Sequence, residues 1–357
     1  MDIALFNDTA VVPHVGCQAV SDGHVRMLAA AGHRVTHRSF VGDEDQYWGG
    51  RRDRAGAVQA ILRRSLRGVL ERADAIVVNG EGTIHHQAGR ALLAVIEAAQ
   101  SLGRPTFLVN AVIEGLDGYD EVLGGLHDLT VRDGHSARFL AARGIRHRLV
   151  PDSCLAAAFD SVPLFDLTGR TVVTDWHWAR EADVGRTVQA VLRRADLRPF
   201  FLPLLHDGHR THWRRIPATL RQADLLVTAR HHGIYMAALA GIPFVALPSN
   251  THKIEGLLEA AGMDIPVCAS LQDVERAIVL AREEPERFSR FNAWLLAHRP
   301  LTTFAGLDEV SDAAAPRPLG VEVELARLEE DREVHQRTRR PGRLAAQTHP
   351  AGATAVT

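Results

Sequence analysis

The sequence predicts an α/β protein with two doubly wound domains, each a parallel sheet covered by helices on both faces. Short apolar stretches alternate with segments of helical periodicity from residue 2 to about residue 150. The alternation breaks at residues 159–170, where Pro163 and Gly169 indicate a linker, and resumes at residue 171. A chain of 357 residues with 46% apolar side chains is long enough to bury a core in each of two domains.

The first half supplies the elements of one sheet. Apolar runs predict strands at residues 2–6, 35–40, 75–78, 106–110, 128–131 and 148–150. Helical spacing predicts helices at residues 21–31, 55–73, 88–101, 119–126 and 134–143. Gly32 is placed to end the first of these helices, and Asp133 to cap the last. Residues 1–158 are therefore expected to form an N-terminal domain.

The second half repeats the pattern. Strands are expected at residues 171–174, 199–203, 225–228, 243–247 and 267–269, and helices at 181–195, 214–222, after Gly233 and at 271–297. We place the C-terminal domain at residues 171–307. In the remaining part, 308–357, residues 321–336 are expected to form one charged helix, and the Pro/Gly/Ala-rich residues 339–357 a disordered tail.

Composition excludes several classes of protein. A net charge of −2, from 41 basic and 43 acidic residues, argues against a nucleic-acid partner. The N-terminus lacks the features of a signal peptide, and no apolar run reaches membrane-spanning length. We expect a cytoplasmic protein with at most peripheral contact at the inner face of the membrane. Cys17, Cys154 and Cys268 are scattered and are expected to be buried thiols of a reducing compartment.

The turn Asn79-Gly80-Glu81-Gly82 follows an apolar strand. Its glycines would let a ligand approach the backbone, but it does not match G-x-G-x-x-G, so no dinucleotide site is expected. Glu81 would repel a phosphate and is better suited to accept a proton from a sugar hydroxyl. The alternative is a tight turn that the fold alone requires.

Three further strand ends carry polar residues. Arg132 ends one strand, and its alternative role is a surface ion pair with Asp133 or another neighbour. Asp152 is expected to accept hydrogen bonds from nearby backbone. His206, His209 and His212 have metal-like spacing in a loop without a carboxylate set, and we expect no metal there.

The strongest signal is Arg230-His231-His232-Gly233, which follows a buried strand and opens a helix. Such a corner is typical of anion sites in open α/β sheets. A histidine in the first helical turn is favoured in its neutral form and can act as a general acid or base. One histidine of the pair is expected to be structural. Lys253, the only lysine of the chain, follows the next strand, so Arg230, His232 and Lys253 are predicted to share a pocket.

These motifs together resemble the polysaccharide pyruvyl transferase family over roughly residues 1–265. The resemblance rests on Val131-Arg132-Asp133-x-x-Ser136, Pro151-Asp152, Arg230-x-His232, Ala240-Gly241-Ile242-Pro243, Lys253, residues 74–83 and residues 14–19. It implies a fold like that of GT-B glycosyltransferases, with the acceptor on the N-terminal and the donor on the C-terminal domain. It also implies phosphoenolpyruvate as the donor and a pyruvate ketal on a cell-surface polysaccharide or its precursor as the product, with no separate cofactor.

By the same resemblance, Arg132, Arg230 and His232 would hold the donor, with His232 and Arg230 as the catalytic pair. His232 would protonate the methylene carbon, and Lys253 would touch the phosphate. The remaining substrate-binding residues would be His231, Asn79, Gly80, Glu81, Gly82 and Gly16. The chain departs from the family pattern at Cys17, which stands in an acidic place, and in the 79–82 turn.

Two other functions fit the same sequence. A nucleotide-sugar glycosyltransferase of this architecture would need a late carboxylate, for which Glu255 and Glu259 are available. A non-catalytic anion-binding protein of glycan assembly would keep the cationic residues without a reaction.

Overall fold

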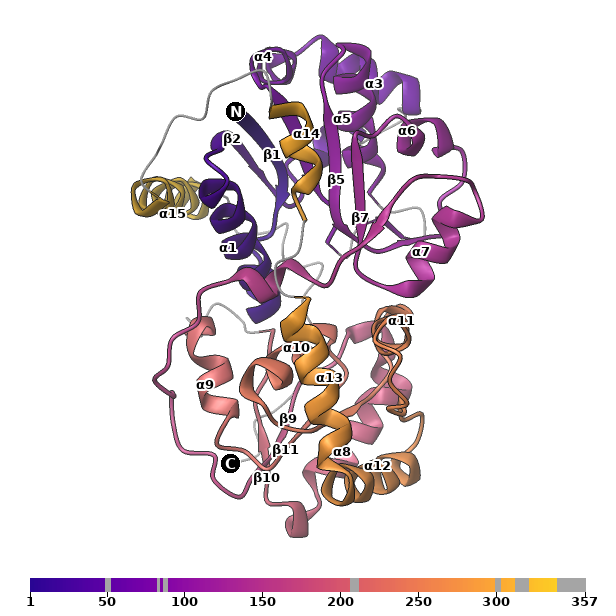
Figure 1. Cartoon of the computed structure of the whole chain (residues 1–357), viewed down its shortest axis with the longest axis vertical. Helices are drawn as coiled ribbons and strands as arrows, with labels where there is room; N and C mark the ends of the chain where they lie inside the picture. The colour runs from indigo at the N-terminus through magenta and orange to yellow at the C-terminus, as the bar shows by residue number, and fades with distance from the viewer. Residues whose placement is uncertain are drawn as a thin grey trace.

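The computed structural model describes residues 1–48, 53–81, 84–85, 89–205, 212–298, 303–311 and 321–338. Its described part contains two large parallel sheets, one in each half of the chain, with helices packed around both (Figure 1). The prediction of an α/β fold with two doubly wound sheets is therefore confirmed.

The first sheet has six parallel strands in the order β2-β1-β3-β5-β7-β8. Their bounds are β1 Asp2–Asp8, β2 Arg34–Phe40, β3 Ala75–Asn79, β5 Thr106–Ala111, β7 Asp128–Val131 and β8 Arg148–Leu149. The central strands β3 and β5 are buried along their whole length, as expected of a sheet covered on both faces. The chain passes from β1 to β2 on one side and then crosses to β3 on the other side of β1. This switch point between β1 and β3 opens a crevice at their carboxyl ends.

Helices surround this sheet, and a small pair of parallel strands lies beside it. The helices are α1 Val15–Ala30, α2 Asp45–Trp48, α3 Arg54–Leu62, α4 Ser65–Arg72, α5 Arg90–Ser101, α6 Asp120–Gly124 and α7 Gly134–Ala141, and the small strands are β4 Ile84–His85 and β6 Ile113–Glu114. The helix expected at 55–73 is interrupted between α3 and α4.

The second sheet has four parallel strands in the order β10-β9-β11-β12. Its strands and helices are β9 Thr171–Val173, β10 Pro199–Phe201, β11 Leu225–Thr228, β12 Phe244–Ala246, α8 Arg186–Leu192, α9 Ile216–Leu220, α10 His231–Ala240, α11 Lys253–Ala260, α12 Leu271–Glu283 and α13 Pro285–Ala297. Short helical turns lie at Ser153–Ala156, Trp178–Arg180, Glu181–Gly185, Ala195–Leu197 and Trp213–Arg215. Here the switch in connection lies between β9 and β11, so the residues that follow these two strands face the same crevice.

The first helix begins six residues earlier than predicted. The side chain of His14 caps α1 by accepting from Gly16 N at 3.0 Å, and Val15 N donates to Leu204 O of the second half at 2.8 Å. Val15, Ala19 and Val20 pack in the core of the second half, which holds this first turn in place. Gly16 and Cys17, which precede the predicted helix, therefore lie inside α1.

Two expected elements near the end of the second half were also wrong in detail. The long helix at 271–297 is two helices, because Pro285 starts α13 and cannot continue α12. The strand at 267–269 is reduced to a single parallel bridge between Ala246 and Val267.

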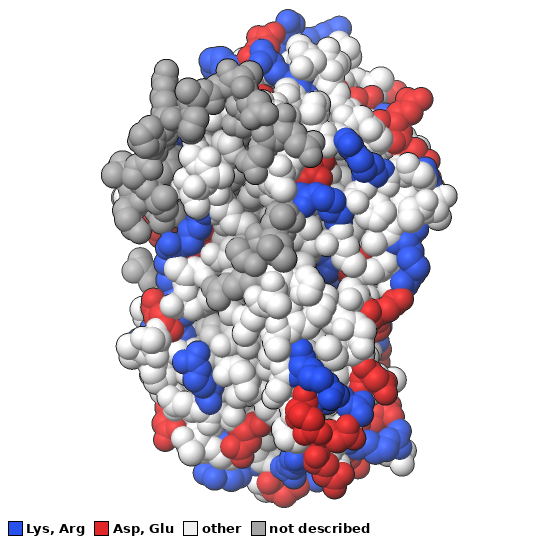
Figure 2. All heavy atoms as spheres, in the orientation of Figure 1, with Lys and Arg blue, Asp and Glu red and all other residues white. Residues whose placement is uncertain are grey.

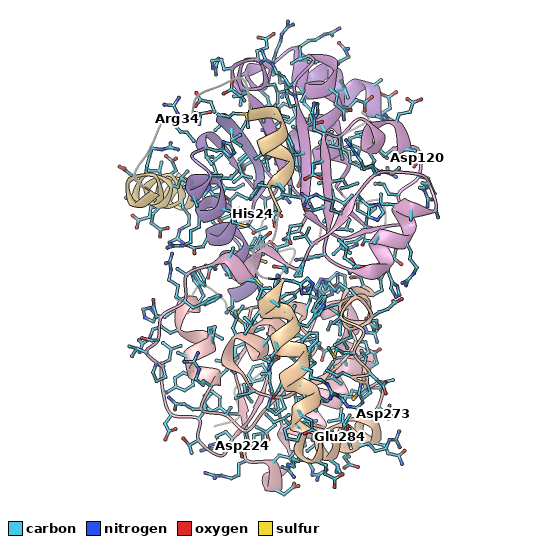
Figure 3. All side chains as sticks on the ribbon, viewed as in Figure 1. His24, Arg34, Asp120, Asp224, Asp273 and Glu284 are labelled. Atoms are coloured by element: carbon cyan, nitrogen blue, oxygen red, sulfur yellow. The ribbon has the colours of Figure 1, made fainter. Side chains whose placement is uncertain are left out.

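The C-terminal segment returns to the first half of the molecule. In α14, Ala305–Ser311, Leu307 packs with Phe304 on Ile3 and Phe107 of the first sheet, and in α15, Val321–Thr338, Leu328 joins the same core. His24 of α1, labelled in Figure 3, contacts Phe304 edge-on at 5.4 Å between ring centroids. Figure 1 shows α13 and α14 following one another from the lower to the upper half. The expected boundary at residue 307 thus falls inside a helix of the first half, while the tail at 339–357 lies outside the described residues.

Charges are evenly mixed on the face shown in Figure 2. Lys/Arg and Asp/Glu side chains lie next to one another on the described part of this face, without a patch of one sign. Among the described residues, no helix has the length and hydropathy that a membrane span requires.

Candidate active site

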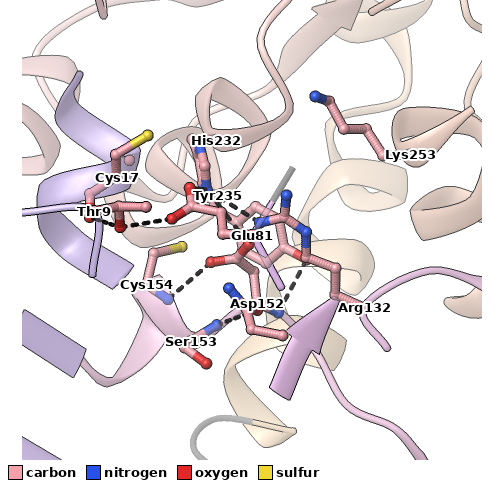
Figure 4. Close-up of polar contacts among 12 residues, drawn as sticks. Thr9, Cys17, Glu81, Arg132, Asp152, Ser153, Cys154, His232, Tyr235 and Lys253 are labelled. Atoms are coloured by element: carbon pink, nitrogen blue, oxygen red, sulfur yellow. Dashed lines mark hydrogen bonds and ion pairs between the residues drawn. The ribbon is translucent and has the colours of Figure 1, made fainter. Parts of the chain in front are cut away.

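A buried ion pair between Arg132 and Asp152 lies at the centre of the candidate site (Figure 4). Arg132 follows β7 and is 2% exposed, and its Nη1 donates to Asp152 Oδ2. Burial opposes both charges, but Arg132 together with His232 holds the pKa of Asp152 well below its usual value. The alternative of a surface ion pair for Arg132 is therefore wrong. Asp152 also accepts from Cys154 N at 2.9 Å, which confirms its predicted local hydrogen bond.

His232, in the first turn of α10, reaches this pair from the second half of the chain. Its Nε2 lies 3.3 Å from Asp152 Oδ2, 3.3 Å from Glu81 Oε1 and 3.5 Å from Arg132 Nη1. The side chains that meet here come from the ends of β3 and β7, from the start of a short helical turn and from α10. The two carboxylates can each accept a hydrogen bond from a protonated Nε2, whereas Arg132 can only donate to an unprotonated one.

Glu81 has a second set of contacts on the side of α1. Its Oε2 lies 2.7 Å from the Thr9 hydroxyl, which is also 2.8 Å from Cys17 O. Burial and the charge of Glu81 raise the pKa of the Cys17 thiol well above its usual value, so this cysteine is a neutral neighbour of the carboxylate. Thr9 was not among the residues expected from the sequence, where its position directly after β1 was its only signal.

Gly16 touches His232 directly. A Cβ at Gly16 would lie 2.0 Å from His232 Cγ and 2.1 Å from Nδ1, so this place in α1 accepts no side chain unless the imidazole moves. The ring of His14 lies 5.5 Å from that of His232. The first turn of α1 thus packs against the His232 imidazole and fixes its position, with Gly16 in direct contact with the ring.

Gly16→Ala is expected to displace the His232 ring and to lower activity at least tenfold, since a shift of about 1 Å in a reacting group has effects of this size or larger. Overpacking should also destabilise the fold by about 1–3 kcal/mol. Steady-state kinetics and urea unfolding measure the two effects. Gly124→Ala in α6 is the control, because a Cβ there meets nothing within 4 Å. Equal activity of the two variants would contradict the contact.

His231 has a different environment from that of His232. It is 2% exposed, neither ring nitrogen has a hydrogen-bond partner among the described residues, and its ring packs edge-on against Tyr235 at 5.0 Å. Burial and the charge of Arg132 lower the pKa of His231 well below its usual value, so it is neutral. The Tyr235 hydroxyl accepts from Asp152 N at 3.2 Å, which links this ring packing to the buried ion pair.

One possible metal-ligand atom from each of three side chains lies within 4.8 Å of the other two; these residues are Asp152, His231 and His232. The guanidinium of Arg132 is already paired with Asp152 and lies beside His232, so a metal cation would meet a permanent positive charge. His206 and His209 lie outside the described residues. The absence of a metal stays a prediction.

Arg230 is held by Asp175 at the end of β9. Its Nε donates to Asp175 Oδ2 at 2.9 Å and its Nη2 to Trp176 O at 2.7 Å, while Asp175 Oδ1 accepts from Leu204 N at 2.7 Å. The side chain keeps 13% of its surface exposed. Arg230 therefore lies at the edge of the crevice, and the buried cluster around His232 does not include it.

Lys253 begins α11 on the other side of the cluster. Its Nζ donates to Asn250 Oδ1 at 2.6 Å, and Figure 4 shows the side chain apart from the hydrogen-bonded network. Burial and the charges of Arg132 and Arg230 lower the pKa of Lys253 to about 7. These three cations are close enough to repel one another, which favours an anion among them.

The rest of the glycine turn is mainly structural. Asn79 exchanges hydrogen bonds with Asn7, at 2.6 and 3.2 Å, and accepts from Glu81 N at 3.1 Å. A Cβ at Gly80 would lie 2.5 Å from that of Ala111, so the turn requires glycine for packing. Gly82 lies outside the described residues.

Comparisons with known proteins agree with this architecture. The solved structures that match include UDP-GlcNAc 2-epimerase from Neisseria meningitidis bound to UDP-GlcNAc, with a TM-score of 0.53 and 12% identity over 86% of this chain and 100% of the other. The MnaA–UDP structure from S. aureus matches with a TM-score of 0.56 and 11% identity over 90% and 100%. At such identities the likeness shows the GT-B-like fold alone.

A search of curated protein sequences found no match. The family model for polysaccharide pyruvyl transferases matches residues 14–251, about two thirds of the chain, and includes all the clustered side chains except Thr9 and Lys253. The chain therefore belongs to the polysaccharide pyruvyl transferase family.

Proposed function

We propose that the chain transfers a pyruvyl group from phosphoenolpyruvate to two hydroxyls of a sugar, forming a ketal on a cell-surface polysaccharide or its precursor. The observation that carries the proposal is the approach of Arg132 and His232 across the two halves, at 3.5 Å, with Lys253 and Arg230 nearby. Phosphoenolpyruvate has a carboxylate and a phosphate on three carbons, so it fits a small site lined by cations. Guanidinium groups bind both of these anions well.

In this mechanism His232 acts first, as a general acid. Its Nε2 proton goes to the methylene carbon of the enol, which becomes a methyl group, and C2 becomes an oxocarbenium-like centre. One sugar hydroxyl attacks C2 and gives its proton to Glu81, which returns a proton to His232 Nε2, 3.3 Å away, before the next turnover. The phosphate then leaves, a second hydroxyl attacks C2, and its proton goes to the departing phosphate. Arg132, Arg230 and Lys253 stabilise the charge on that phosphate.

Glu81 suits the acceptor side for two reasons. It follows β3 in the first half, and its carboxylate is 3.3 Å from His232 Nε2, so it lies beside the group that delivers the first proton. A carboxylate repels the donor phosphate and accepts from a hydroxyl, which separates the two substrates within one site.

The pH dependence of donor binding tests the role of Lys253. With a pKa of about 7, Lys253 is charged below that pH and becomes neutral as the pH rises through it, so its attraction for phosphate is lost at higher pH. Between pH 6 and pH 8 the charged fraction of Lys253 falls about tenfold. Over this range the rise in KM for phosphoenolpyruvate should therefore be about tenfold larger in the native protein than in Lys253→Met. Lys253→Arg should hold KM low across this range. Parallel profiles for the native protein and Lys253→Met would exclude the role.

Mass spectrometry of glycan precursors incubated with phosphoenolpyruvate tests the function itself. A mass increase of one pyruvyl ketal, with release of one phosphate per ketal, is the expected result. Thermal stabilisation by phosphoenolpyruvate, compared with a panel of UDP- and GDP-sugars, separates this function from that of a nucleotide-sugar glycosyltransferase. Stabilisation by nucleotide sugars alone would overturn the proposal. Of the two carboxylates that such an enzyme could use, Glu259 is paired with Arg138 and His135, whereas Glu255 Oε2 is buried without a hydrogen-bond partner among the described residues.

A further inference from the structure

A second set of contacts joins the two halves beside the candidate site, between α7 and α11. His252, which precedes α11, places Nε2 at 3.1 Å from Asp133 Oδ1 and Nδ1 at 3.2 Å from Glu114 Oε2. Its ring stacks on that of His135, with centroids 4.6 Å apart and an angle of 21° between the planes. Asp133 and Glu114 belong to the first half, and His252 to the second.

The backbones of the two helices approach closely at the same place. A Cβ on Gly256 of α11 would lie 3.0 Å from Asp133 Cβ, and one on Gly134 of α7 would lie 3.3 Å from Gly256 O. At the outer end, Glu259 pairs with His135 at 3.3 Å and with Arg138. The contact is therefore continuous along α11, from His252 before its first turn to Glu259 near its end.

The residues that make this contact are the sequence neighbours of the proposed donor-binding cations. Asp133 follows Arg132 directly, and His252 directly precedes Lys253. Asp133 is fully buried and is fixed by accepting from Ser136 N at 2.8 Å and from the Ser136 hydroxyl at 2.6 Å. The ion pair between Asp133 and His252 thus sets the distance between Arg132 and Lys253, although neither of these two cations takes part in it.

We propose that His252 is a positioning residue: bound between Asp133 and Glu114, it holds the two halves closed and sets Lys253 opposite Arg132 for the donor. The proposal rests on the proposed function for its link to phosphoenolpyruvate, but the closure itself does not depend on it. His252 is only partly buried and does not touch the buried network of His232, so it acts through the position of α11.

Geometry also indicates which charge state of His252 closes the contact. Both ring nitrogens face a carboxylate, and a neutral imidazole can donate from only one of them, so the closed state favours the imidazolium. Burial opposes this, but Asp133, Glu114 and Glu255 of the same helix raise the pKa of His252 above its usual value. Among the described residues, the ring of His135, stacked on His252, is the other titratable group that faces it. Closure is therefore strongest below about pH 6.5 and weakens as the pH rises through the raised value.

Hydrogen exchange of the backbone amides in the first turns of α7 and α11 measures closure without any assay of activity. In the native protein, protection corrected for the intrinsic rate should fall several-fold from pH 6 to pH 8.5. In His252→Gln it should be low at both pH values. His298→Gln is the control, because the one side-chain hydrogen bond of His298 to a described residue is with Trp294 O, at 2.7 Å, so this variant should follow the native protein. Native-like protection in His252→Gln would overturn the proposal.

Steady-state kinetics give the second readout. His252→Gln should raise the KM for phosphoenolpyruvate about tenfold and change kcat less than threefold, since the reacting groups stay in place. An unchanged KM alongside lost protection would show closure without positioning, and would overturn the link to the donor. If the native protein does not use phosphoenolpyruvate at all, the proposed function fails and the exchange experiment alone decides whether His252 closes the two halves.

Discussion

Replacing His232 by alanine is expected to lower kcat by about a thousandfold while the protein remains folded. Positioned general acids contribute about 10²–10⁴ to a rate, and His232 is the group that faces Glu81, Asp152 and Arg132 through one nitrogen. Because the lost proton donor acts mainly in the transition state, kcat and kcat/KM should fall together. Stopped assays of phosphate release with saturating phosphoenolpyruvate measure the effect.

His231→Ala is the matched control for this experiment. The two histidines are adjacent and both buried, but His231 makes only ring contacts and has no hydrogen-bond partner among the described residues. Its loss should reduce stability through the cavity it leaves, with a much smaller effect on kcat. Near-native kcat in His232→Ala, or equal losses in the two variants, would show that His232 is not the acid.

Arg132→Met is expected to destabilise the fold by about 3–5 kcal/mol, in addition to any loss of activity. Removing one member of a buried ion pair leaves the other charge without compensation, and Asp152 has a fully buried side chain. The sequence alone predicts mainly weaker donor binding for such a change. Urea unfolding measures the loss, and Arg67→Met is the control: its partner Glu71 is on an exposed helix surface, so a change below about 1 kcal/mol is expected.

A second substitution separates charge from packing. Adding Asp152→Asn to Arg132→Met removes the unpaired carboxylate and should recover a large part of the lost stability, without recovering activity. If the double variant is as unstable as the sum of the single ones, the two side chains do not interact as the structure indicates. Recovery of activity would mean that Arg132 does not bind the donor.

The fold and the central site residues follow from short-range signals in the sequence. Buried strands such as β3 and β11 appear as apolar runs, and the residues at their carboxyl ends are polar because the crevice lies there. Arg132 and His232 were identified from such positions. That they meet each other followed only from the family resemblance, because the contact spans 100 residues and depends on how the two halves pack.

Other features have no short-range signal. The early start of α1 depends on Leu204 of the second half, and the place of Gly16 behind His232 follows from it. Likewise, a sequence gives no sign that Arg230 is paired with Asp175, because a strand end is equally suited to a free or a paired arginine. The pairing of Asp133 with His252 is of the same kind.

The return of α14 and α15 to the first sheet has a mechanical consequence. The polypeptide crosses between the halves after Leu149 and again after α13, so two covalent tethers join them. Twisting one half against the other would strain both tethers, whereas bending about the line through them strains neither. Substrate entry should therefore involve a hinge motion about the line through the two tethers, with α7 and α11 at the edge that opens.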